Sequence, residues 1–152
     1  MIELVDTSDP DAVRNKENIL AFYDLAINQR QCAEAAARYI SPSYVQHNPL
    51  IPDGGEALGQ FFAQVLKDRA RPRVVVHRII AVGDHVCAHV NFVGLFNDDP
   101  DDQGIAGVDI FRMDADGRAA EHWDALQLVG DPTNSAPWFA PDVPRANQNG
   151  MF

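Results

Sequence analysis

Side chains that could do chemistry recur in three stretches of alternating apolar sequence in the second half of the chain. The first carries His89 and Asn91, the second carries Asp109, and the third carries His122 and Asp124. Because alternate residues of a strand share a face, we expect each to lie among apolar neighbours. Burying such a group costs about 1–3 kcal/mol unless it finds a partner. The pattern therefore predicts one cavity into which these five side chains converge, where carboxylates and imidazoles can transfer protons.

The same residue types can also bind a metal or serve only the structure. His47, His89 and His122, together with Asp109 or Asp124, are ligand types that transition metals accept. The histidines lie far apart and form no closely spaced ligand pair, so we predict no metal site and no cofactor. Each histidine could equally be a hydrogen-bonded core residue, and each aspartate could belong to a structural ion pair.

Three predicted helices precede these stretches. Ser8–Asp11 is typical of a helix start, with a capping hydroxyl, an early proline and acidic residues in the first turn. Apolar residues then recur at helical spacing from Ile19 to Ile27, and again from Cys32 to Ile40. Ser41-Pro42 should end the second helix, because the residue before a proline avoids helical geometry. Asp53–Gly55 opens the third helix.

Four predicted strands follow, separated by polar or glycine-containing turns. In chain order they are Val74–Val82, His85–Phe96, Ile105–Met113 and Arg118–Val129. Short connections between sequential strands imply an antiparallel meander. Helices followed by a meander are typical of the α+β class, in which the helices gather on one face of the sheet.

The strand faces opposite the polar residues are also apolar. They carry Val90 and Phe92, Val108 and Ile110, and Trp123 and Ala125. A sheet with helices on one side should present a polar back to water. This apolar back predicts a homodimer through the outer face of the sheet.

Length and charge exclude several classes of protein. The 152 residues suit one domain, 1–152, and 22 acidic against 12 basic residues give a net charge of −10. This acidity argues against nucleic acid or an anionic membrane as a partner. Eight of the acids lie in residues 1–11 and 98–102, so the charge does not predict a cationic substrate.

No apolar run approaches the roughly 18 residues of a membrane helix, and the N-terminus lacks signal-peptide features. With Cys32 and Cys87 expected as reduced thiols, we predict a cytoplasmic protein.

Two clusters carry a family resemblance, Tyr44-Val45-Gln46-His47-Asn48-Pro49 and Glu121-His122-Trp123-Asp124. With His89 and Val108–Arg112 between them, and helices before a meander, the chain resembles the SnoaL-like polyketide cyclases of the nuclear transport factor 2-like superfamily. The similarity spans about residues 12–129 and leaves a C-terminal tail at 130–152. It implies a cone-shaped α+β barrel of N-terminal helices packed on a curved, mainly antiparallel sheet that encloses a pocket.

The resemblance also implies cofactor-independent acid/base chemistry on a small carbonyl-containing or polyketide-like molecule. Proton abstraction would lead to aldol cyclisation, isomerisation or dehydration. Asp124 matches the pocket aspartate of the family, with His122 and Asp109 as further catalytic residues. The expected substrate-binding residues are Tyr44, His47, His89 and Asn91. The alternatives are a metal-dependent enzyme that uses the His/Asp cluster, and a non-catalytic domain that binds a small molecule.

Overall fold

The computed structural model describes residues 1–130, 143, 144, 146, 147 and 149–152. Its helices are α1 (Pro10–Tyr23), the π-helix η1 (Asp24–Asn28), α2 (Cys32–Tyr39) and α3 (Gly55–Leu66). Its strands are β1 (Ile2–Val5), β2 (Ile40–Gln46), β3 (Arg73–Val82), β4 (His85–Val93), β5 (Ile105–Met113) and β6 (Ala119–Leu128). The predicted order of helices followed by a meander is confirmed, and β1 and β2 are added to it.

The helices begin and end where local sequence signals direct them. The cap of α1 is the Asp9 carboxylate rather than the predicted Ser8 hydroxyl, and it accepts a hydrogen bond from the backbone N–H of Asp11 at 3.0 Å. α2 ends at Tyr39, because Ile40 already has extended geometry two residues ahead of Pro42. No helix in the described part of the chain combines the length and the apolarity needed to cross a bilayer.

The six strands form one mixed sheet in the order β1-β3-β4-β5-β6-β2. β3 to β6 are the predicted antiparallel meander. β1 lies parallel to β3, and β2 lies parallel to β6. The parallel pairs add one strand at each edge of the meander, so the sheet curves around the helices without closing.

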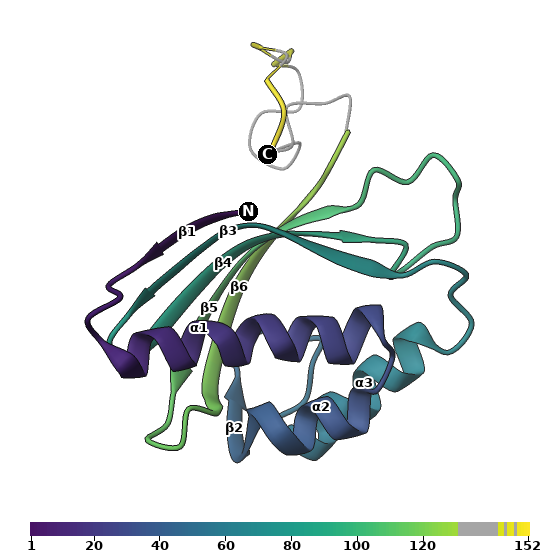
Figure 1. Cartoon of the computed structure of the whole chain (residues 1–152). Helices are drawn as coiled ribbons and strands as arrows, with labels where there is room; N and C mark the ends of the chain where they lie inside the picture. The colour runs from purple at the N-terminus through teal and green to yellow at the C-terminus, as the bar shows by residue number, and fades with distance from the viewer. Residues whose placement is uncertain (131–142, 145, 148) are drawn as a thin grey trace.

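Helices cover one face of this curved sheet and give the chain its cone-shaped α+β fold (Figure 1). The covered inner face contributes the fully buried Val86, Ala88 and Val90 of β4 to the core. On the outer face, Val108 and Ile110 of β5 are 42% and 40% exposed. The predicted apolar outer face is therefore present on β5, but on β4 the prediction is wrong, because Val90 and Phe92 lie on the inner face.

The tail expected at 130–152 lies largely outside the described residues. Its last residue, Phe152, stacks on the His77 ring, with ring centroids 4.0 Å apart, and lies 5.1 Å from the His89 ring. The end of the chain therefore contacts the outer side of the sheet, away from the helices (Figure 1).

Candidate active site

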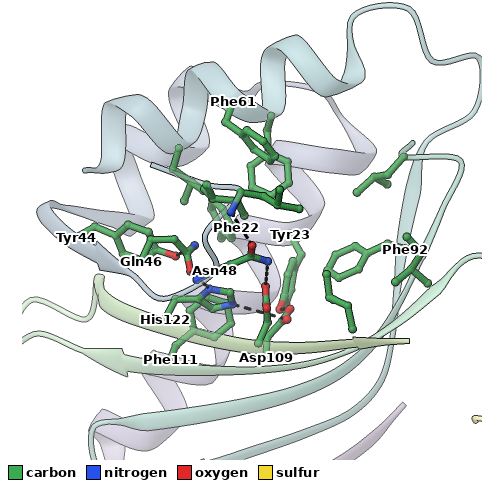
Figure 2. A pocket seen from close by; sticks show the side chains of 18 of the residues that line it. Phe22, Tyr23, Tyr44, Gln46, Asn48, Phe61, Phe92, Asp109, Phe111 and His122 are labelled. Carbon is green, nitrogen blue, oxygen red and sulfur yellow. Dashed lines mark hydrogen bonds and ion pairs between the residues drawn. The ribbon is translucent and has the colours of Figure 1, made fainter. Parts of the chain in front are cut away.

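A pocket with a mostly apolar wall lies between the helices and the inner face of the sheet (Figure 2). Its aromatic lining residues are Phe22, Tyr23, Tyr44, Phe61, Phe62, Phe92, Phe96 and Phe111. Its aliphatic lining residues are Leu50, Ile51, Leu58, Leu95, Ile105 and Leu126. The other lining residues are Gln46, Asn48, Asp109, His122 and Asp124. The polar side chains on β5, β6 and the end of β2 thus meet in otherwise apolar surroundings.

Asp109 and Asp124 are direct partners across β5 and β6. Cross-strand partners share a face, so both carboxyl groups point into the pocket. His122 lies two residues before Asp124 on the same face, and its Nε2 is 3.7 Å from Asp109 Oδ1. One atom from each of the three side chains lies within 4.8 Å of the others. The structure therefore brings together three of the predicted site residues, while their roles stay predictions.

Tyr23, the last residue of α1, holds Asp109 in place. The Tyr23 hydroxyl donates a hydrogen bond to Asp109 Oδ2 within the buried part of the pocket wall. Burial, followed by the negative charge of Asp109, raises the pKa of Tyr23 well above its usual value, so the hydroxyl keeps its proton. The π-helix η1 starts at the next residue, and such widened turns are frequent at functional sites.

Gln46 orients His122. The backbone N–H of Asn48 donates to Gln46 Oε1 at 2.9 Å, which fixes the end of the amide that faces His122. His122 Nδ1 lies 2.9 Å from the same oxygen. An amide oxygen only accepts hydrogen bonds, so Nδ1 carries a hydrogen and Nε2 is the atom directed at Asp109.

Asn48 orients Asp124. The Asn48 Nδ2 donates to Asp124 Oδ2 at 2.8 Å. The neighbouring cation Arg112 is bound instead to Glu121, at 2.9 Å. Asp124 is therefore held by a neutral amide rather than by this arginine, and it faces the pocket.

Tyr44 lines the pocket, as the sequence predicted, and is 2% exposed. Its hydroxyl oxygen accepts a hydrogen bond from Gln46 Nε2 at 2.9 Å. Burial, then the negative charges of Asp109 and Asp124, raise the pKa of Tyr44 far above its usual value. The hydroxyl therefore keeps a proton that it can donate.

Sequence reasoning missed Gln46 and Asn48, although both lie in a segment that it singled out. The alternation of the strand was the available signal, because Tyr44, Gln46 and Asn48 share one face and His47 must point the other way. Tyr23 had no such signal, since an aromatic residue on an apolar helix face is typical of a core. Pairing of β2 with β6 then brings the Tyr44 face beside Asp124.

His47, predicted as a substrate-binding residue, lies outside the pocket lining. Its ring lies flat on Trp123, with centroids 4.9 Å apart and planes 5° apart, and its Nε2 is 2.9 Å from Glu121 Oε1. Hydrogen bonds from His47 and Arg112 lower the pKa of Glu121. These contacts join the end of β2 to β6 behind the pocket wall rather than inside it.

The placement of His89 and Asn91 in the pocket is also wrong. Ala88 is the cross-strand partner of Asp109, so the even-numbered residues of β4 face the pocket and the odd-numbered ones face outward. His89 Nδ1 lies 3.0 Å from an Arg78 nitrogen, and Asn91 Nδ2 donates to the Gln103 carbonyl at 3.0 Å. Burial and the nearby Arg78 lower the pKa of His89.

Among the described residues, one group of three side chains could hold a metal ion, namely Asp109, His122 and Asp124. The set differs from the histidine-rich one considered in the sequence, because His47 and His89 lie outside the pocket. Two carboxylates and one imidazole can serve either as proton carriers or as metal ligands.

A model of the SnoaL-like domain family matches residues 19–122, more than half of the chain. The chain belongs to the SnoaL-like family. The matched segment runs from the middle of α1 to His122 and includes Asp109. No curated protein matches this SnoaL-like chain.

Solved structures with the same fold include cyclase and isomerase candidates. A candidate polyketide cyclase from Bacillus cereus is 19% identical, with a TM-score of 0.69 over 82% of this chain and 83% of its own. A candidate ketosteroid isomerase from Kribbella flavida is 17% identical, with a TM-score of 0.63 over 92% of this chain and 97% of its own. A nuclear transport factor 2-like protein of unknown function from Cytophaga hutchinsonii is 17% identical, with a TM-score of 0.59 over 82% and 94%. At these identities the likeness concerns the fold.

Proposed function

We propose that this SnoaL-like protein is a cofactor-independent acid/base enzyme that removes a proton next to the carbonyl group of a small, largely apolar molecule. The observation that carries the proposal is the placement of Asp124. Its Oδ2 is held by Asn48, and its other oxygen has no hydrogen-bond donor among the described residues, in a pocket walled by aromatic rings. A carboxylate held in position beside a bound ketone can act as the general base that removes such a proton.

The neighbouring groups suit the negative charge that such a reaction creates. Loss of the proton turns the carbonyl into an enolate, whose oxygen needs hydrogen-bond donors. Tyr44 has a hydroxyl proton that no described acceptor uses, and Asn48 has a second amide hydrogen besides the one bound to Asp124. Protonated His122 would supply a third donor, balanced by Asp109.

The apolar wall supports the size and character of the proposed substrate. Phe22 and Phe61 come from the helices, and Phe92 and Phe111 come from the sheet, so rings line both sides of the pocket (Figure 2). Aromatic walls favour flat or cyclic carbon skeletons. Aldol cyclisation, isomerisation and dehydration of such a ketone share the enolate-forming step.

Deuterium exchange tests the shared step without knowledge of the natural reaction. Cyclic and aryl ketones are incubated with the protein in D₂O, and mass spectrometry follows replacement of hydrogen at the carbon next to the carbonyl. We expect Asp124→Asn to slow exchange about 10²- to 10⁴-fold, the usual contribution of a positioned base. Glu34→Gln, a matched change on exposed α2, should leave the rate unchanged.

Two results would contradict the proposal. If the Asp124→Asn variant catalyses deuterium exchange as fast as the wild type, Asp124 is not the base. No exchange above the buffer rate with any ketone that binds would favour the alternative of a binding domain.

We also propose that two copies associate through the outer face of the sheet. Ile80 and Ile110 are each 40% exposed there, and both belong to one row of residues that runs across β3, β4 and β5. Burial of the apolar side chains of such a row against a second copy of the chain stabilises the dimer. Light scattering should give a dimer for the wild type and a monomer for Ile110→Lys; a monomeric wild type at micromolar concentration would refute the interface.

A further inference from the structure

Three side chains of the kinds that bind metals converge in the pocket, Asp109, His122 and Asp124. Tyr23 donates to Asp109 Oδ2 and Asn48 donates to Asp124 Oδ2, so the other oxygen of each carboxylate has no hydrogen-bond donor within the described residues. His122 Nε2 lies 3.7 Å from Asp109 Oδ1, and in a neutral ring with its hydrogen on Nδ1 this nitrogen offers a lone pair. Two carboxylates and a ring nitrogen this close together suit a positive species between them, either a proton on His122 or a metal ion.

The groups around these acceptors are those that support a metal ligand. A metal-binding histidine normally donates its second ring N–H to an oxygen acceptor, which fixes the ring and its tautomer. Gln46 Oε1 plays this part for His122, and Gln46 is itself held by the backbone N–H of Asn48. Metal-binding carboxylates are likewise held by hydrogen bonds from neighbouring side chains. The Tyr23 hydroxyl donates such a bond to Asp109 Oδ2. His122 and Asp109 are 6% and 3% exposed, so this scaffold is built into the pocket wall.

We propose that Asp109, His122 and Asp124 bind one divalent transition-metal ion, of the Zn²⁺ or Co²⁺ class. One nitrogen and two carboxylate oxygens suit this class better than Mg²⁺ or Ca²⁺, which take oxygen ligands. Ligand atoms about 2.1 Å from an ion lie about 3.4 Å apart in a tetrahedral site. The three atoms lie within 4.8 Å of one another, so side-chain shifts of about 1 Å would close the site.

The ion competes with the proposed proton transfer. Coordination occupies the free oxygen of Asp124, so the metal-bound protein has no base to offer a ketone. The site therefore gives the SnoaL-like protein a reversible inhibitor that binds where the substrate reacts.

The test measures binding directly, so its outcome is separate from that of the exchange assay. Chelator-treated protein is titrated with Co²⁺ and then Zn²⁺, followed by the visible bands of Co²⁺ and by calorimetry. We expect one ion per chain, displacement of Co²⁺ by Zn²⁺, and loss of the Co²⁺ bands in Asp124→Asn. Gln46→Ala keeps all three ligands and should weaken binding about 10- to 100-fold, the usual effect of removing an outer hydrogen-bond partner.

Matched controls separate this site from surface binding. His85→Ala and Asp101→Asn remove an exposed histidine and an exposed hairpin carboxylate, and both should bind as the wild type does. Circular dichroism confirms that each variant is folded, and Asp124→Asn is the gentlest ligand change because it keeps the shape of the side chain. Equal binding by Asp124→Asn and wild type, or loss of binding in Asp101→Asn alone, would mean an adventitious ion only and overturn the proposal. Failure to bind either ion would overturn it as well.

Discussion

The hydrogen bond between Tyr23 and Asp109 should be among the strongest polar contacts in this chain. Tyr23→Phe removes only the hydroxyl and leaves Asp109 Oδ2 buried without its donor. Hydrogen bonds to ionised groups contribute about 1.5–3 kcal/mol, so we expect the free energy of unfolding to fall by about 2 kcal/mol. For a chain of this length that corresponds to a drop of about 4–8 °C in Tm. Tyr44→Phe loses a neutral hydrogen bond from Gln46 and should cost about 0.5–1.5 kcal/mol.

A double-mutant cycle assigns the cost to the pair. Urea denaturation is measured for the wild type, Tyr23→Phe, Asp109→Leu and the double variant. Once Asp109 is replaced by an apolar residue, the Tyr23 hydroxyl has lost its acceptor, so Tyr23→Phe should be nearly neutral in that background. We expect a coupling energy of about 1 kcal/mol or more. A coupling energy near zero, with equal cost of Tyr23→Phe in both backgrounds, would show that this hydrogen bond does not stabilise the fold.

Two further predictions concern the loop that leads from β4 to β5. Gly104 has φ +94°, and an added Cβ would lie 2.8 Å from the Phe92 carbonyl oxygen, so Gly104→Ala should cost about 2 kcal/mol or more in urea denaturation. Gly150→Ala, which meets nothing within 4 Å, is the control and should change stability by less than about 0.5 kcal/mol. Partial burial pushes the pKa of Asp102 upward, but hydrogen bonds from the backbone N–H groups of Gly94 and Gly104 outweigh it and leave the pKa below 3.8. Because the pKa of Asp102 is lower in the folded state, its ionised carboxylate stabilises the fold above pH 3.8. This contribution is lost as the pH falls through the pKa of the folded state. Asp102→Asn should therefore be less stable than the wild type at pH 7, with a difference that shrinks below pH 3.8; a difference independent of pH would contradict this.

Strand alternation predicted the polar side of the pocket wall where the strand carried a clear apolar pattern. On β5 and β6 it placed Asp109, His122 and Asp124 on one face, and the cross-strand register agrees. On β4 both faces are largely apolar, so the pattern could not say which one meets the helices. The polar pair His89 and Asn91 was assigned to the pocket, and the register shows the opposite.

The rest of the site depends on contacts between distant parts of the chain. β2 reaches β6 by a parallel pairing about 75 residues away in sequence, as the Gln46–His122 partners show, and no local signal gives such a partner. Tyr23 meets Asp109 only because the end of α1 crosses the sheet at β5. These long-range contacts explain why the fold class and four pocket residues, Tyr44, Asp109, His122 and Asp124, could be predicted from the sequence, but not the groups that orient them.

Chemical rescue of Asp124→Ala tests directly whether the Asp124 carboxylate is the base. The variant removes the carboxylate and leaves space beside Asn48 for a small carboxylic acid from solution. Deuterium exchange into a bound ketone is measured in Asp124→Ala and in wild type, with increasing acetate at constant pH and ionic strength. We predict that exchange is lost in the variant and returns in proportion to acetate, while the wild type does not respond. Exchange in Asp124→Ala at the wild-type rate, or an equal acceleration of both proteins by acetate, would show that Asp124 is not the base.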